Sequence, residues 1–193
     1  MEMTIEEERQ RTARSYKLIL LFAMVSMFMM FAGLTSAFVV SKSRPDWLND
    51  FQLPTAFFYS TAVIIGCSVT FHLAKKAIQK GNRSSTTSFL LATLALGILF
   101  VVLQLVGFGQ IVDSGYYFTG SESKITTTFL YVVTVVHLVH LVGGMISLLI
   151  IIYNHFKQKY NSTQTLGIEL GAMYWHFLDL LWVYLFLFLY FFK

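Results

Sequence analysis

Five long apolar stretches, each followed by turn-forming or charged residues, most constrain what this chain can fold into. A bilayer core about 30 Å thick is crossed by about 20 apolar residues in a helix. The stretches that reach this length cover about residues 17–40, 55–73, 88–110, 127–153 and 169–192. Lipid offers the backbone no hydrogen-bond partner, so each stretch is predicted to be helical, and none shows the alternation of β-barrel strands. We therefore predict an all-α, polytopic membrane bundle with five transmembrane helices.

Composition excludes several other classes of protein. The chain is 56% hydrophobic and 12% charged, whereas soluble domains carry about 25% charged residues. The net charge of +4 is modest, and the basic residues are dispersed, which argues against binding to nucleic acid. A single cysteine provides no disulfide framework.

The basic residues predict the orientation of the bundle, because cytoplasmic loops of membrane proteins are enriched in Lys and Arg. Ten lie on the side of the N-terminus: Arg9, Arg11, Arg14, Lys17, Lys75, Lys76, Lys80, Arg83, Lys157 and Lys159. Four lie on the other side: Lys42, Arg44, Lys124 and Lys193. We predict a cytoplasmic N-terminal tail over residues 1–16, a transmembrane domain over 17–193, and an external C-terminus.

Ionisable side chains inside apolar helices are costly and need a partner or a function. The candidates for structural polar packing are Gln104, His137, His140, Glu169, His176 and Asp179. His137 and His140 share one helix face, as do His176 and Asp179, because residues three apart are neighbours. Counting from the span ends puts His140 and Asp179 within about 5 Å of the same level. We therefore predict a hydrogen bond between Asp179 and a histidine of the preceding helix.

Three functional alternatives to buried structural histidines are a metal site, a cytochrome b and a small transporter. A zinc site needs three or four ligands, and only His176 and Asp179 could complete one with His137 and His140. The Glu-x-x-His motif of di-iron bundles is not present. A free-standing cytochrome b would use His137, His140 and His176 as axial ligands, but the first two differ by only about 4.5 Å in height. Five unbroken spans give little support to a small transporter. Small residues are expected to be helix contacts: Gly33, Ala37, Gly66, Gly97, Gly107, Gly109, Gly143 and Gly144.

The last span carries a specific pattern, made of Tyr174, Trp175, His176, Phe177, Asp179 and Trp182. It closely resembles the Tyr-Trp-His-Phe-x-Asp-x-x-Trp signature of subunit III of the haem-copper terminal oxidases. Weaker similarities follow in the right order, with Thr134, His137, His140, Gly143 and Gly144 in the fourth span and Gly97, Phe100 and Gln104 in the third. The resemblance covers about residues 17–192, and the length is similar to the five-helix bacterial form.

The resemblance implies an accessory subunit of a respiratory complex that reduces oxygen to water and pumps protons. Such a subunit holds no catalytic, cofactor-binding or metal-binding residue, since the haems and copper lie in partner subunits. It packs mainly against catalytic subunit I, assembles with subunit II, binds phospholipid, and resides in the bacterial cytoplasmic (inner) membrane. The implied complex is a cytochrome c oxidase, and a quinol oxidase stays open.

Two positions depart from the family pattern. Family members often carry an acidic residue just after the serine of the first span, where this chain has Met27. A second acidic residue usually follows the glutamine of the third span by three positions, where this chain has Gly107. Any role of those carboxylates in the family therefore does not transfer to this chain.

Overall fold

The computed structural model describes residues 5–48, 51–120, 123–162 and 164–192 as a bundle of five long helices. All five are long and apolar enough to cross a membrane, and the described residues contain no strand. The predicted all-α, multi-pass fold is confirmed. The elements are α1 (Ile5–Val40), the short 3-10 helix η1 (Ser41–Ser43), α2 (Thr55–Gln79), α3 (Arg83–Asp113), α4 (Ile125–Phe156) and α5 (Leu166–Phe192).

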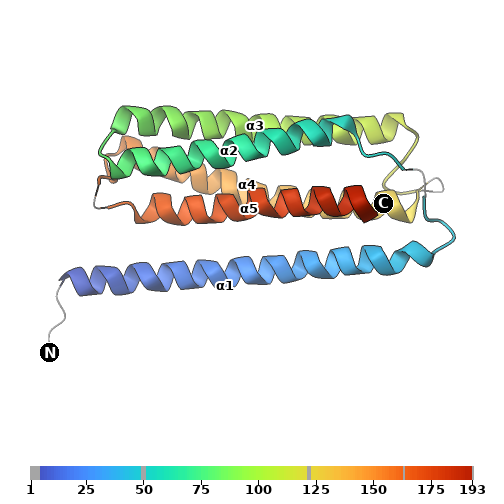
Figure 1. Ribbon diagram of the computed structural model, residues 1–193, viewed down its shortest axis with the longest axis horizontal. Coiled ribbons are helices and arrows are strands. Elements are labelled where there is room, and N and C mark those ends of the chain that lie inside the picture. The colour runs from blue at the N-terminus through green and yellow to red at the C-terminus, as the bar shows by residue number, and fades with distance from the viewer. Residues whose placement is uncertain (1–4, 49–50, 121–122, 163, 193) are drawn as a thin grey trace.

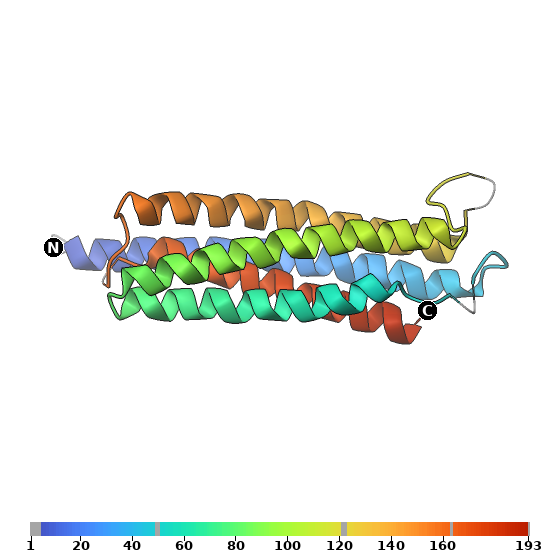
Figure 2. The same cartoon turned by 90° about the horizontal axis from the view of Figure 1, so that it is seen from above.

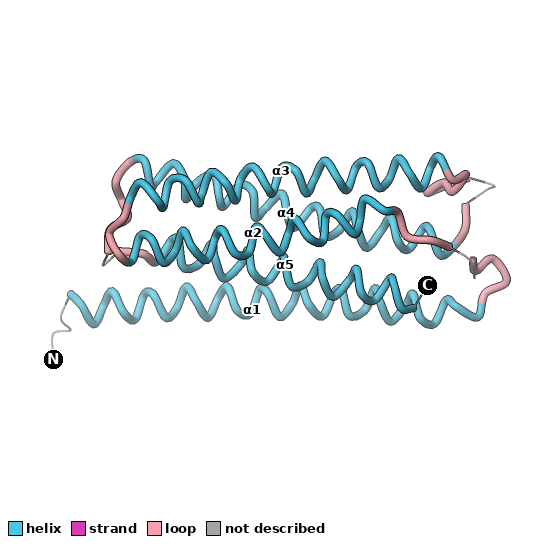
Figure 3. The backbone as a smooth tube through the Cα atoms, turned by 45° about the horizontal axis from the view of Figure 1, so that its top comes forward, coloured by secondary structure: helices cyan, strands magenta, loops and turns pink. Residues whose placement is uncertain are grey.

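The helices run alternately up and down, so the two ends of the chain lie at opposite ends of the bundle (Figure 1). The connection between α2 and α3 is the shortest in the bundle, as the tube view shows (Figure 3). The α2–α3 hairpin has the most extensive contact, whereas α1 packs on α4 and α5 and stands apart from the α2–α3 layer (Figures 1 and 2). Which end of the bundle faces the cytoplasm remains a prediction from the charges.

The helices extend beyond the predicted apolar spans, because hydropathy detects only the part that lipid would cover. Most of the tail is helical, since α1 begins at Ile5 and not near residue 17. The second helix continues to Gln79, six residues past the predicted end at 73. Residues 1–4 of the predicted tail and Lys193 lie outside the described residues.

The α2–α3 hairpin is closed by a short turn whose residues suit the geometry. Gly81 has φ of 73°, a left-handed conformation that costs glycine little. The Asn82 side chain accepts a hydrogen bond from the Ser85 backbone N–H at 3.1 Å, which caps the first turn of α3. At the other end of the hairpin, the Gln110 side chain on α3 accepts from the Ala56 N–H at 3.3 Å. The neighbouring helix thus satisfies an N-terminal amide of α2, which begins after Pro54.

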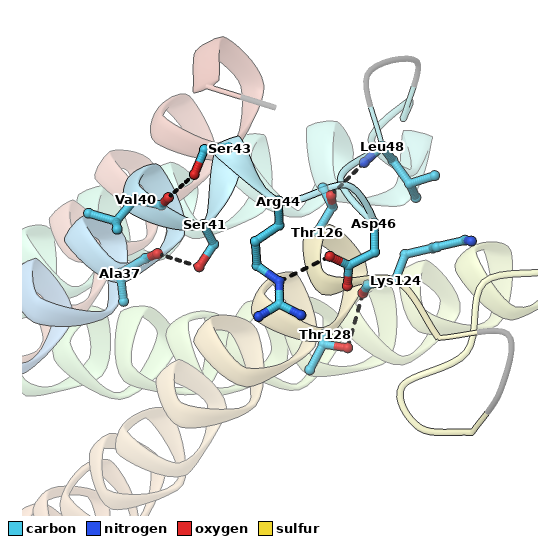
Figure 4. Close-up of polar contacts among 10 residues, drawn as sticks. All are labelled: Ala37, Val40, Ser41, Ser43, Arg44, Asp46, Leu48, Lys124, Thr126 and Thr128. Carbon is cyan, nitrogen blue, oxygen red and sulfur yellow. Dashed lines mark hydrogen bonds and ion pairs between the residues drawn. The ribbon is translucent and has the colours of Figure 1, made fainter.

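The connection between α1 and α2 is attached to the start of α4 (Figure 4). The Leu48 N–H donates to Thr126 Oγ1 at 2.9 Å, and Arg44 Nε donates to Asp46 Oδ1 at 3.0 Å. The hydrogen bond from Arg44 lowers the pKa of the exposed Asp46 carboxyl. The Trp47 ring also packs against Phe38 of α1, with ring centroids 4.7 Å apart. These contacts hold the far end of α1 against the bundle.

Candidate functional site

The polar residues predicted inside the bundle are distributed over several contacts between helices. His137 of α4 is fully buried at the centre, among aromatic rings. Its ring centroid lies 5.2 Å from Trp182 of α5, 6.1 Å from Phe100 of α3 and 6.5 Å from Phe31 of α1. Neither ring nitrogen has a hydrogen-bond partner among the described residues. The imidazole is therefore enclosed by aromatic rings of α1, α3 and α5.

His140 lies one turn from His137 and has a different role. Its Nδ1 hydrogen-bonds to the Val136 carbonyl oxygen at 2.7 Å, and its ring packs 5.7 Å from Phe31. Its own backbone carbonyl accepts a hydrogen bond from Tyr174 Oη at 3.1 Å. Tyr174, the first residue of the signature on α5, is therefore connected to α4 through the backbone of His140 and not through its imidazole.

The predicted hydrogen bond between Asp179 and a histidine of α4 is wrong. Asp179 is 4% exposed, and neither carboxylate oxygen has a hydrogen-bond partner among the described residues. The carboxylate faces α2, near Ser68, whereas His137 faces the aromatic rings of α1, α3 and α5. Depth along the membrane was comparable, but the two side chains leave their helices toward different neighbours.

His176 shares the α2-facing side of α5 with Asp179, as the three-residue spacing predicted. Its Nδ1 is 2.6 Å from Ser68 Oγ. On α2, the exposed His72 lies beside it, with ring centroids 6.1 Å apart. The polar face of α5 is thus matched by Ser68 and His72 of α2.

Glu169 connects the first helix to the last. Lys17 Nζ lies 2.6 Å from Glu169 Oε2, and Thr165 Oγ1 donates to Glu169 Oε1 at 2.7 Å. Both side chains are partly exposed at the predicted cytoplasmic end of the bundle. The sequence could not indicate this pair, because its two members lie 152 positions apart.

Gln104 of α3 is fully buried, and its Nε2 donates to Ser60 Oγ of α2 at 2.9 Å. A second hydrogen bond to α2 comes from α5, where Trp182 Nε1 donates to Thr61 Oγ1 at 3.1 Å. Sequence reasoning missed Ser60, Thr61 and Ser68 as partners. These hydroxyl residues lie on α2 at positions 60–61 and 68, which are about two helical turns apart. This spacing could have indicated a polar face on α2.

Trp175, one of the two buried tryptophans of the signature, is packed against glycines of neighbouring helices. A Cβ on Gly97 of α3 would lie 3.3 Å from the Trp175 ring and 2.9 Å from Met145 Sδ. A Cβ on Gly144 of α4 would lie 3.4 Å from Trp175 and 2.9 Å from Leu178 Cδ1. These glycines therefore allow the Trp175 indole to lie between α3 and α4.

The other predicted glycine contacts vary. Gly107 receives the Phe57 ring of α2 so closely that a Cβ there would overlap it. A site that holds an acidic residue in the family therefore holds an aromatic contact here. The prediction is wrong for Gly33 and Gly109, where a Cβ would have no neighbour within 4 Å among the described residues. Gly171, which the sequence did not single out, is tight against Ile151.

The described part of the chain contains no group of three or more His, Cys, Asp or Glu side chains that could hold a metal ion. His137 faces the aromatic centre, His140 bonds to its own helix, and His176 faces α2. Since two axial ligands must converge on one iron, this divergence does not fit the cytochrome b alternative. The arrangement is suited to helix packing.

Comparison with known proteins gives a consistent result. Residues 2–193 match the family described as cytochrome c oxidase subunit III. The chain is 31% identical over 172 residues to cytochrome c oxidase subunit 3 of Drosophila yakuba, a match that covers 86% of this chain and 62% of that protein. The corresponding protein of Spodoptera frugiperda is 32% identical over 142 residues, with 74% of this chain and 90% of that protein covered.

The protein of the same name from Pelomedusa subrufa is 32% identical over 143 residues, which cover 74% of this chain and 51% of that protein. The chain therefore spans about half to two thirds of the length of two of these three relatives.

Proposed function

Because this chain belongs to the cytochrome c oxidase subunit III family, we propose that it is the non-redox accessory subunit of a proton-pumping haem-copper oxidase. The family match over residues 2–193 is the observation that carries this proposal. In the proposed complex the haems and copper lie in other subunits, and this chain packs against catalytic subunit I, assembles with subunit II and binds phospholipid. We further propose the bacterial cytoplasmic membrane as its location, with the N-terminus inside.

The interior of the bundle supports a packing role over a redox role. The most deeply buried imidazole, His137, is enclosed by Phe31, Phe100 and Trp182. Several apolar side chains of α1 are instead exposed, including Ile19 at 65%, Phe22 at 68% and Met29 at 68%. Lipid or a neighbouring subunit would cover such a surface in a membrane.

Co-purification tests the proposal. A tagged full-length chain, isolated in mild detergent from the membranes of its own host, is expected to bring along larger subunits that carry haem. After dissociation of the complex, the haem absorption is expected to stay with those subunits. Oxygen consumption of the intact complex with reduced cytochrome c and with a quinol then identifies the electron donor.

Histidine variants separate the proposal from the cytochrome b alternative. His137→Phe and His140→Phe are expected to leave the haem content per complex unchanged, because neither imidazole is a ligand in the proposed assembly. Loss of haem in either variant, or a Soret band from the isolated chain, would contradict the proposal and favour a cytochrome.

A further inference from the structure

Three fully buried side chains on α3 and α4 have polar atoms without a protein partner. These atoms are Gln104 Oε1, Thr134 Oγ1 and both ring nitrogens of His137, judged among the described residues. Buried polar atoms in folded proteins are nearly always hydrogen-bonded, to protein or to ordered water. Leaving a hydroxyl or amide unpaired in an apolar interior is unfavourable. An explanation is needed for several such atoms in one region.

The helix register places Gln104 and Thr134 at the same level. Three residues before Thr134, Tyr131 of α4 stacks on Phe108 of α3, with ring centroids 5.1 Å apart. Three residues after Thr134, His137 of α4 packs on Phe100 of α3, with ring centroids 6.1 Å apart. Thr134 is midway between Tyr131 and His137, and Gln104 is midway between Phe108 and Phe100. Since α3 and α4 are neighbouring antiparallel helices, this register puts Gln104 and Thr134 on neighbouring turns of the two helices.

Neighbouring hydrogen bonds fix which end of the Gln104 amide faces α4. Ser60 Oγ donates its proton to the Phe57 carbonyl oxygen at 2.9 Å. It can therefore only accept from Gln104, so the amide nitrogen faces Ser60 and the amide oxygen remains available on the other side. The Oε1 atom is then a free acceptor within the bundle.

Thr134 also differs from other threonines in these helices. Thr35, Thr61 and Thr93 each donate their hydroxyl proton to the carbonyl oxygen one turn earlier, at 3.0, 2.7 and 2.8 Å. Thr134 makes no such bond with the described residues. Its hydroxyl is thus available both to donate and to accept. His137 lies one turn away on the same face, about 4.5 Å along the helix axis.

We propose that Gln104, Thr134 and His137 form a binding site for one internal water molecule between α3 and α4. The water donates one hydrogen bond to Gln104 Oε1 and exchanges hydrogen bonds with the Thr134 hydroxyl and a ring nitrogen of His137. Three partners are typical of a buried water. Through Gln104 and Ser60, the water extends a polar connection from α4 across α3 to α2.

A structure of the full chain, in the membrane complex with which it purifies, tests the site directly. At a resolution that shows ordered water, we expect a density peak about 2.7–3.2 Å from both Gln104 Oε1 and Thr134 Oγ1. The peak should persist in Thr134→Ser, which keeps the hydroxyl, and disappear in Thr134→Val. A direct Gln104–Thr134 hydrogen bond, or no density between them, would overturn the proposal.

Thermal unfolding of the full chain in detergent tests the same site without a map. Gln104→Leu and Thr134→Val should each lower the melting temperature, because each leaves the other side's polar atom without its bridging water. The double variant should lose no more than the larger single loss. Thr93→Val is the matched control, since its hydroxyl already has partners at Phe89 and Thr70, and its loss should add to that of Gln104→Leu. Additive losses for Gln104 and Thr134 would contradict a shared water.

Discussion

The contact between Gly107 and Phe57 gives a quantitative test of how α2 and α3 pack. A methyl group on Gly107 would overlap the Phe57 ring. That ring is fully buried and is held edge-to-face by Trp182 at 5.7 Å and Phe108 at 6.3 Å. It therefore has little freedom to move away. Overpacking of a well-packed core costs about 1–3 kcal/mol.

Gly109 is a matched control on the same helix. A Cβ at Gly109 would meet nothing within 4 Å among the described residues. Replacing glycine by alanine in a helix contributes about 1 kcal/mol of stability, and both variants gain it. Gly107→Ala should therefore be net destabilising by about 0–2 kcal/mol, and less stable than Gly109→Ala by about 1–3 kcal/mol.

The assay is unfolding of the purified full chain by titration with SDS, followed by its far-UV circular dichroism. Phe57→Leu removes the edge of the ring, so the double variant Gly107→Ala/Phe57→Leu should lose less stability than the two single losses added together. Equal stabilities of Gly107→Ala and Gly109→Ala would refute the reasoning that Gly107 is there to receive the ring.

Three further predictions concern other contacts. Trp182→Phe loses the bond to Thr61, worth about 0.6 kcal/mol, and part of the packing of the ring on Phe57 and Phe100. Trp182→Ala loses nearly all of that packing and should cost more, about 3–5 kcal/mol in the same SDS titration; equal losses would show that packing is not the main contribution. Asp46 should titrate below the ordinary range in NMR, and Arg44→Gln should raise its pKa, because the Arg44 hydrogen bond lowers it. This contribution to stability is present above the unfolded-state pKa of the carboxyl and is lost as the pH falls through its folded-state pKa. Asp179→Leu should reduce the yield of assembled complex without shifting its haem spectrum, since it alters the buried α2–α5 contact near Ser68; a shifted spectrum at full yield would contradict this role.

The helices could be predicted from the sequence because lipid leaves a chain few choices. An apolar run of sufficient length must satisfy its own backbone hydrogen bonds, so hydropathy alone locates it. The helical continuation over residues 5–16 was not detectable in this way, because the residues there are polar.

The partners of the buried polar groups could not be predicted in the same way. Spacing shows that His176 and Asp179 share a face, and the structure places both toward α2. The spacing alone does not show which neighbouring helix this face contacts, because that depends on the rotation of α5 relative to three other helices. The predicted Asp179–histidine bond failed for this reason, although the levels of the two residues were compatible. Contacts such as Lys17–Glu169 depend on the whole arrangement of the bundle.

The position of α1 has a consequence for how the chain enters the membrane. Its tertiary contacts are mainly with α4 and α5, which a ribosome makes after α2 and α3. During synthesis the first helix must therefore stay in the bilayer on the strength of its own hydropathy while the next two helices pair beside it. Only when α5 emerges can Glu169 reach Lys17 and join α1 to a helix made much later in synthesis.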